Sequence, residues 1–161
     1  MIGAGLRRSE VAALTFNNTQ QRDSRWVIVD IIGKGNHVRS VPIPSWVKLA
    51  VDEWQSIAGI AGGLVFRAIH KGGHITHDSI TPQAIRDIVK QYGAMIGRPE
   101  LAAHDLRRTY AKLAHKAGAG VDQIQLSLGH LSLKTTERYP GTLQNLTDAP
   151  GDRLGRTLGT D

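Results

Sequence analysis

Hydrophobic residues recur along this chain at the spacings that distinguish helices from strands. In most of the chain the apolar positions return every three or four residues, as in Leu106, Tyr110 and Leu113, which is the repeat of an amphipathic helix. Glycine or proline follows most of these stretches and would end each helix. The predicted helices cover residues 6–14, 46–58, 81–96, 104–117 and 121–128, with a last turn or two over 132–139.

Two other stretches are rich in β-branched residues. Residues 26–32 and 38–43 are separated by a short polar connection, and this pattern predicts a β-hairpin with Lys34 at its tip. Residues 17–18 and 20–24 are typical of turns, and residues 64–66 are typical of an irregular or briefly extended piece. The pattern as a whole predicts a mainly α protein with a small antiparallel β-sheet, in the α+β class.

The end of the chain differs from the rest. After Thr142 the sequence is polar and contains Pro150 and several glycines. We expect this tail either to be partly disordered or to dock elsewhere on the protein. The chain is therefore divided into one domain over residues 1–141 and a C-terminal tail over residues 142–161.

The net charge of the chain indicates which class of partner it binds. The 161 residues include 20 Lys and Arg against 14 Asp and Glu, which gives a net charge of +6 and an isoelectric point near 10.0. This excess favours a polyanionic partner, with nucleic acid as the leading candidate. A basic protein without a special partner is the alternative, because +6 is modest, so the motifs have to decide.

Cysteine usage and hydropathy exclude several classes. The chain has no cysteine, which excludes disulfides, thiolate nucleophiles and cysteine-ligated zinc. Its apolar runs are too short to span a bilayer, and charged residues interrupt the opening segment where a secretion signal would lie. We therefore expect a cytoplasmic protein with no membrane partner.

Several residues suit the cleavage of a phosphodiester without a metal. That reaction requires cations around the non-bridging oxygens, a nucleophile, and an acid for the departing hydroxyl. His104 and Arg107 are three positions apart, so on a helix they share a face and can reach one phosphate; a capping histidine and a solvated arginine are the alternative. Tyr139 precedes Pro140, which predicts a helix end, and His130 lies nine residues earlier. Taken alone, Tyr139 is equally a packing residue.

A metal site is the competing hypothesis for the histidines in the middle of the chain. His70, His74 and His77 lie close together in the sequence, with Asp78 beside them. No cysteine accompanies them, and the surrounding glycines favour a flexible turn. We expect neither a metal nor a cofactor.

Four motifs, in order, resemble those of the tyrosine recombinase or phage integrase family. The resemblance extends from about Gly3 to Tyr139. It implies a tyrosine recombinase catalytic-domain-like fold over residues 1–141. The four motifs are Gly5-Leu6-Arg7-Arg8-Ser9-Glu10, Gly33-Lys34-Gly35-Asn36, His104-Asp105-Leu106-Arg107-Arg108-Thr109, and Leu128-Gly129-His130-Leu131-Ser132 followed by Thr135-Thr136-Glu137-Arg138-Tyr139.

The resemblance implies a nucleophile and an acid. Tyr139 would attack the scissile phosphate and form a 3′-phosphotyrosyl link. Lys34 would be the acid for the 5′ hydroxyl that departs. Because the phosphotyrosyl link keeps the energy of the phosphodiester, a second strand's 5′ hydroxyl could rejoin without ATP or a metal.

The resemblance also implies five residues around the phosphate. Arg7 and Arg107 would grip it and neutralise its transition state. His104 and His130 would donate hydrogen bonds to its oxygens, and His104 would help to manage the proton of the nucleophile. Glu10 would act in support, by orienting its neighbours.

The function implied by the resemblance is that of a site-specific DNA recombinase or integrase catalytic domain, with double-stranded DNA as its partner. Family members carry a helical DNA-binding domain and further helices ahead of the first arginine, and this chain is expected to lack those first helices. The alternative function is a non-catalytic DNA-binding remnant or regulator derived from an integrase. A homo-oligomer on DNA is left open, no small-molecule substrate is expected, and the implied location is cytoplasmic, associated with the nucleoid when bound to DNA.

Overall fold

The computed structural model describes residues 1–129 and 149–159, and for Lys34, Arg156 and Thr157 it describes the backbone alone. His130, Tyr139 and the turns predicted over 132–139 lie outside the described residues. Within them the fold is mainly α-helical with two small antiparallel sheets, so the predicted fold class is confirmed.

Helices make up most of the described chain. The helices predicted over residues 46–58, 81–96, 104–117 and 121–128 are confirmed as α2 to α5. The described helices are α1 (Arg8–Ala12), α2 (Ser45–Ile57), α3 (Pro82–Met95), α4 (Ala103–Lys116), α5 (Val121–Leu128) and α7 (Pro150–Leu158), with short 3-10 turns η1 (Phe16–Asn18) and η2 (Lys34–Asn36).

The first helix is shorter than predicted. The residues before α1 are not helical: Gly5 has a φ of +61°, and Arg7 is extended with φ −75° and ψ 157°. A Cβ at Gly5 would lie 2.9 Å from the Tyr110 ring, so α4 packs directly against this backbone. The prediction of a helix from residue 6 was wrong because this close approach requires a left-handed residue just ahead of it.

The three-stranded sheet has the order β1-β2-β3, with β1 (Thr19–Arg22), β2 (Arg25–Ile32) and β3 (Val38–Pro42) all antiparallel to their neighbours. The predicted hairpin of β2 and β3 is confirmed, with Lys34 in the connection. The prediction of turn structure over residues 20–24 was wrong where β1 extends to Arg22. This edge strand is polar and mostly exposed, and backbone pairing to β2 holds it, so no apolar alternation reveals it.

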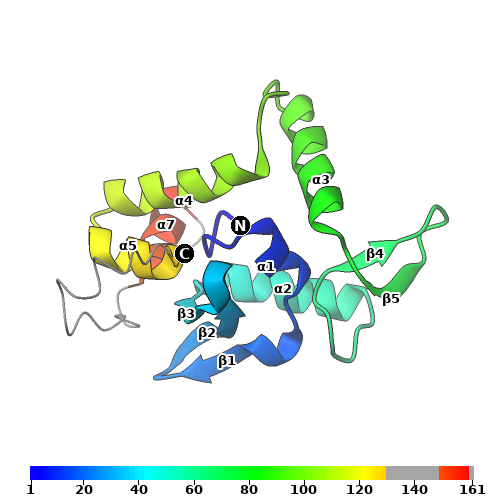
Figure 1. Ribbon diagram of the computed structural model, residues 1–161, viewed down its shortest axis with the longest axis horizontal. Helices are drawn as coiled ribbons and strands as arrows, with labels where there is room; N and C mark the ends of the chain where they lie inside the picture. The colour runs from blue at the N-terminus through cyan, green and yellow to red at the C-terminus, as the bar shows by residue number, and fades with distance from the viewer. Residues whose placement is uncertain (130–148, 160–161) are drawn as a thin grey trace.

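A second hairpin lies further along the chain. It consists of β4 (Arg67–Ile69) and β5 (Ile75–Ser79), and β4 begins just after the piece predicted to be irregular or briefly extended. That piece pairs briefly with the N-terminal part, as predicted: Leu64 forms an isolated antiparallel bridge with Thr15, and the N–H of the fully buried Val65 donates to the Leu14 carbonyl at 2.9 Å. In Figure 1 this hairpin and α3 project from one side of the molecule.

Two apolar clusters form the core. The larger contains side chains from the N-terminal segment, α1, β2 and β3, with Val47, Val51 and Trp54 of α2 packed against it. The smaller contains Tyr110 and Ala114 of α4 together with side chains of the following loop and α5. Figure 1 shows α4, α5 and α7 grouped on the opposite side from the β4–β5 hairpin.

The tail contains a packed helix that the sequence pattern does not predict. Leu154 of α7 is fully buried, and Arg153 donates to the Ala117 carbonyl at 3.0 Å, just past the end of α4. Asp152 forms an ion pair with Arg25 of β2. Residues 149–159 thus dock on both parts of the molecule. No helix in the described part of the chain is long and apolar enough to cross a membrane.

Candidate active site

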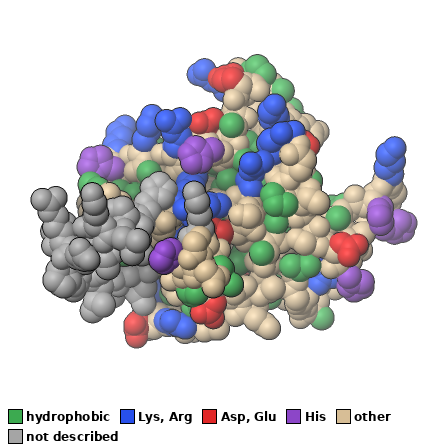
Figure 2. Space-filling model, viewed as in Figure 1, with side chains coloured by type: hydrophobic (Ala, Val, Ile, Leu, Met, Phe, Trp, Pro, Cys, Tyr) green, Lys and Arg blue, Asp and Glu red, His purple; other side chains and the backbone are tan. Residues whose placement is uncertain are grey.

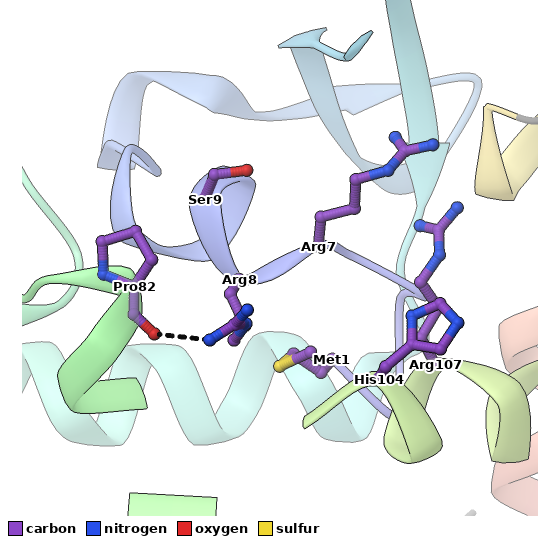
Figure 3. Close-up of a pocket in the computed structure, with 7 residues that line it drawn as sticks. All are labelled: Met1, Arg7, Arg8, Ser9, Pro82, His104 and Arg107. Carbon is purple, nitrogen blue, oxygen red and sulfur yellow. Dashed lines mark hydrogen bonds between the residues drawn. The ribbon is translucent and has the colours of Figure 1, made fainter. Parts of the chain in front are cut away.

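A pocket of about 300 Å³ lies where the N-terminal segment, α3 and α4 meet. Arg7 and Arg8 contribute to it from the start of α1, and His104 and Arg107 from the first turns of α4. Figure 3 shows the Arg7 and Arg107 guanidiniums on the same side of the pocket, with the His104 ring beside Arg107. Arg8 turns the other way, toward the Pro82 carbonyl at 3.5 Å. Three of the residues predicted for the site therefore converge on one pocket.

Arg107 is the buried cation of this pocket. Its residue is 3% exposed, and its two terminal nitrogens donate to the carbonyls of Gly5 and Leu128. Burial and the nearby charge of Arg7 lower the pKa of Arg107 to about 10, so it remains a cation at neutral pH. The two carbonyls fix the direction in which its remaining N–H groups point.

Glu10 holds Arg7 in place. The Glu10 carboxylate accepts from the Arg7 backbone N–H at 2.7 Å and from Nη1 of the Arg7 side chain at 2.8 Å. Burial alone would raise the pKa of Glu10, but hydrogen bonds from Arg39 and Arg7 outweigh it and lower the pKa to about 2. Glu10 is therefore ionised at every pH near neutrality. Its supporting role in catalysis stays a prediction.

Arg39 is a member of this cluster that the sequence reasoning missed. Its Nη1 and Nη2 each donate to a Glu10 carboxylate oxygen at 2.8 Å, a two-pronged pairing that suits arginine. A signal was present in the sequence: Arg39, Val41 and Ile43 alternate, so on a strand they share the inward face. An arginine on that face requires a buried partner.

The end of α5 brings these arginines together. Three successive carbonyls, which the helix itself leaves unpaired, each accept from a different arginine. Ser127 accepts from Arg39 at 2.9 Å, Leu128 from Arg107, and Gly129 from Arg7 at 3.4 Å. The residue after Gly129 is His130, a residue of the predicted site that lies outside the described residues.

The cluster carries a surplus of positive charge. Three guanidinium cations, those of Arg7, Arg39 and Arg107, face one carboxylate, that of Glu10, which leaves a net charge of +2. Attack on a phosphodiester raises the charge on the phosphorus centre from −1 to −2 in the transition state. A fixed, partly buried cation cluster stabilises such a centre without reorganising.

The remaining predicted residues are placed less fully. The backbone of Lys34 lies in η2 between β2 and β3, as predicted. A Cβ on the preceding Gly33 would lie 3.4 Å from Arg7 Nη1, so this connection runs beside the cluster. His130 and Tyr139 lie outside the described residues. The histidines of the β4–β5 hairpin show no grouping suited to a metal with other described residues.

The fold and the pocket are those expected from the motifs of the recombinase family, and comparison with known proteins tests that resemblance. Residues 1–144 match the phage integrase family. The chain belongs to that family.

Curated proteins named tyrosine recombinase XerC are similar to this chain. The protein from Stutzerimonas stutzeri (strain A1501) is 32% identical over 139 residues, which cover 84% of this chain and 44% of the relative. That from Pseudomonas putida (strain W619) is 30% identical over 165 residues, which cover 98% and 52%. The chain thus spans about half the length of the curated relatives it matches.

Solved structures share the fold. A crystal structure of XerA recombinase aligns with a TM-score of 0.61 at 22% identity, covering 90% of this chain and 51% of that one. The XerH site-specific recombinase bound to its difH substrate in a pre-cleavage complex aligns with a TM-score of 0.62 at 21% identity, covering 84% and 39%. The fold is therefore that of recombinase catalytic domains.

Proposed function

We propose that this chain is the catalytic domain of a site-specific DNA recombinase that cleaves and rejoins DNA strands through a 3′-phosphotyrosyl intermediate. The observation that carries the proposal is the pocket in which Arg7, His104 and Arg107 meet, with both guanidiniums held by protein partners. Membership of the phage integrase family supports the same function.

The pocket suits the scissile phosphate. Arg7 and Arg107 contact its non-bridging oxygens, and His104 donates a further hydrogen bond from the exposed rim. The oxygen of Tyr139 attacks phosphorus and loses its proton with the help of His104. The bond from phosphorus to the 5′ oxygen breaks, and Lys34 protonates the departing oxygen. Religation by another 5′ hydroxyl reverses these steps.

The roles of Lys34 and His130 rest on the family motifs and on the positions of their neighbours. Gly33 precedes Lys34 and lies beside Arg7. Gly129 precedes His130 and accepts a hydrogen bond from Arg7 at 3.4 Å. Both residues therefore follow directly on segments that contact the cluster.

A basic stripe on α4 supports duplex DNA as the substrate rather than a small phosphate compound. The exposed residues of α4 recur at helical spacing, so they form one line that starts at the pocket and runs along the helix. Over this length α4 extends about 18 Å, which is enough to follow several phosphates of a DNA backbone. Figure 2 shows Lys and Arg side chains gathered along this edge of the molecule. The stripe consists of His104, Arg108, Lys112, His115 and Lys116.

Acting on DNA, the protein would work in the cytoplasm, and assembly into a homo-oligomer on the DNA belongs to the same proposal. Its DNA complex can be sized by light scattering with one-site and two-site duplexes. A complex with two or more protein chains on the two-site duplex is expected.

Covalent trapping tests the catalytic proposal. The protein is incubated with a pool of duplexes that carry a randomised site and a nick, which lets the short cleaved strand diffuse away. We expect a protein–DNA adduct that survives denaturing gels, and its DNA identifies the site. The adduct should be absent for Tyr139→Phe and present for Tyr92→Phe, a matched change at an exposed tyrosine of α3.

Two other outcomes would contradict parts of this proposal. Sequence-selective DNA binding without any adduct would support the non-catalytic DNA-binding regulator instead. An adduct that persists in Tyr139→Phe would remove Tyr139 from the role of nucleophile.

A further inference from the structure

Arg39 lies behind the pocket rather than in its wall. Its side chain is 9% exposed, and the pocket is lined by other described residues, among them Arg7 and Arg107. Arg39 is on β3 opposite Ile31, a buried residue of β2, so the sheet directs it toward the interior. Any effect of Arg39 on a bound phosphate must therefore pass through other residues.

The Arg39 side chain touches three separate segments of the site. It pairs with Glu10 through two hydrogen bonds of 2.8 Å, and its Nε donates to the Ser127 carbonyl of α5 at 2.9 Å. A Cβ at Gly129 would lie 3.0 to 3.2 Å from Arg39 atoms, and one at Gly33 would lie 3.4 Å from its Nη1. The residues after Gly33 and Gly129 are both residues of the predicted site.

We propose that Arg39 is a positioning residue that holds Glu10, and through it the phosphate-binding side chain of Arg7, in register with the end of α5. The inference rests on the proposed function, because it assumes that Arg7 binds the scissile phosphate. Arg39 itself makes no contact with the substrate. Arg39 fixes the relative positions of three segments: the β2–β3 hairpin, the start of α1 and the end of α5.

Arginine is required for this role by its shape. Three of its five N–H groups are engaged, two by one carboxylate and one by a backbone carbonyl at a different angle. A lysine ammonium is a compact charge and cannot span Glu10 and Ser127 with the same geometry. Charge alone therefore does not replace Arg39.

Arg39 also keeps Glu10 ionised. The charged groups that face Glu10 are Arg7 at the start of α1, Arg39 on β3 and Arg107 on α4. Without Arg39, only the hydrogen bonds from Arg7 remain to offset the effect of burial on Glu10, and the pKa of Glu10 rises. A protonated Glu10 would hold the Arg7 guanidinium less firmly.

The first test compares Arg39→Met with Arg22→Met, a matched loss of an arginine from the exposed edge strand β1. The trapped-adduct assay is run in single turnover with saturating protein, and the dissociation constant for the same duplex is measured separately. We expect adduct formation by Arg39→Met to be slower by about 10- to 100-fold, because misplacement of a charge clamp acts on the chemical step. The dissociation constant should change by less than about threefold, and Arg22→Met should behave as wild type.

A pH profile separates positioning from a general loss of structure. Each rate is expressed relative to wild type at the same pH, so that the pH dependence shared by all variants cancels. The relative rate of Arg39→Met should fall further as the pH is lowered, because Glu10 without Arg39 gains its proton at a higher pH than in wild type. Adding Glu10→Gln should remove this pH dependence. A deficit that is the same at every pH and unaffected by Glu10→Gln would overturn the inference.

Arg39→Lys covers the case in which Arg39→Met does not fold. It keeps the buried charge, and its melting curve identifies folded protein. We expect its adduct formation to remain at least about tenfold slower than wild type, because the ammonium cannot hold both segments. Wild-type rates in Arg39→Lys would overturn the inference.

A titration with inorganic phosphate tests the role of Arg39 separately from the recombinase proposal. If wild type forms no adduct, the recombinase proposal fails, and Arg39 is then judged by titrating phosphate and following the His104 ring signals by NMR. Wild type should bind phosphate in the pocket, and Arg39→Met about tenfold more weakly. Equal affinities would overturn the role of Arg39 whether or not the chain cleaves DNA.

Discussion

The two arginines of the pocket differ in how much of the fold depends on them. The side chain of Arg7 is 30% exposed and is held by the Glu10 carboxylate and a longer hydrogen bond to the Gly129 carbonyl, whereas Arg107 is 3% exposed and satisfies two backbone carbonyls. Arg107 therefore serves the fold in addition to its proposed role at the phosphate, while Arg7 retains access to solvent.

Replacing Arg107 should reduce stability as well as cleavage. Arg107→Ala leaves the Gly5 and Leu128 carbonyls without their partner in a buried place, which costs about 2–4 kcal/mol. Denaturant unfolding measures this loss. Arg108→Ala is the matched control, because the neighbouring arginine is exposed and should change stability by less than about 0.5 kcal/mol. Equal stabilities for the two variants would show that the carbonyl contacts do not hold the fold.

The sequence predicted the pocket residues but not the residue behind them. Arg7, His104 and Arg107 were found because their types and order match the family motifs, and the i, i+3 spacing of His104 and Arg107 predicted a shared helical face. Arg39 was missed because no motif includes it. Its inward position follows only from the register of β3 and from the carboxylate that it meets across the chain.

At the scale of elements, helices with a regular apolar repeat were predictable and elements held by docking were not. The α3 helix has a proline in its first turn and a Thr81 cap that accepts from the Ala84 N–H at 3.0 Å, so its start is visible in the sequence. The α7 helix has two glycines and a narrow apolar face, and tertiary contacts stabilise it. A Cβ at Gly151 would lie 2.9 Å from the Gly3 carbonyl, so a small residue is needed where α7 meets the N-terminal segment.

Docking of α7 should contribute measurably to stability. Leu154→Ala removes a fully buried side chain and should cost about 2–4 kcal/mol through lost burial and the cavity that remains. Urea unfolding gives the difference. Leu158→Ala at the exposed end of the same helix should cost less than about 1 kcal/mol. A small effect at Leu154 would mean that α7 does not support the core.

At the scale of the molecule, charge is distributed so that one edge is basic. The net charge is only +6, but α4 presents its cations as a single stripe that starts at the pocket. Composition pointed to a polyanion, and only the fold shows that the basic residues and the pocket lie along one surface line.

Salt dependence tests this surface. Binding of a duplex should weaken with salt with a log–log slope of about −3 or steeper, through the release of counterions. Lys112→Gln with Lys116→Gln should make that slope shallower by about 1 to 2, and Arg22→Gln on the far edge strand should leave it unchanged. Fluorescence anisotropy at several salt concentrations gives the slopes. An affinity that does not vary with salt would contradict DNA binding through this stripe.

The arginines that donate to the carbonyls at the end of α5 also link the parts of the molecule built on the two apolar clusters. Arg107 joins the backbone of the larger apolar cluster at Gly5 to the smaller cluster at Leu128, and Arg39 joins β3 to α5. The pocket lies where the parts of the molecule built on the two apolar clusters meet, so it exists only while these two parts are packed together. A phosphate held between Arg7 and Arg107 would favour the state in which the two parts are packed together. By thermodynamic linkage, DNA binding would then stabilise the domain, and a more stable domain would bind DNA more tightly.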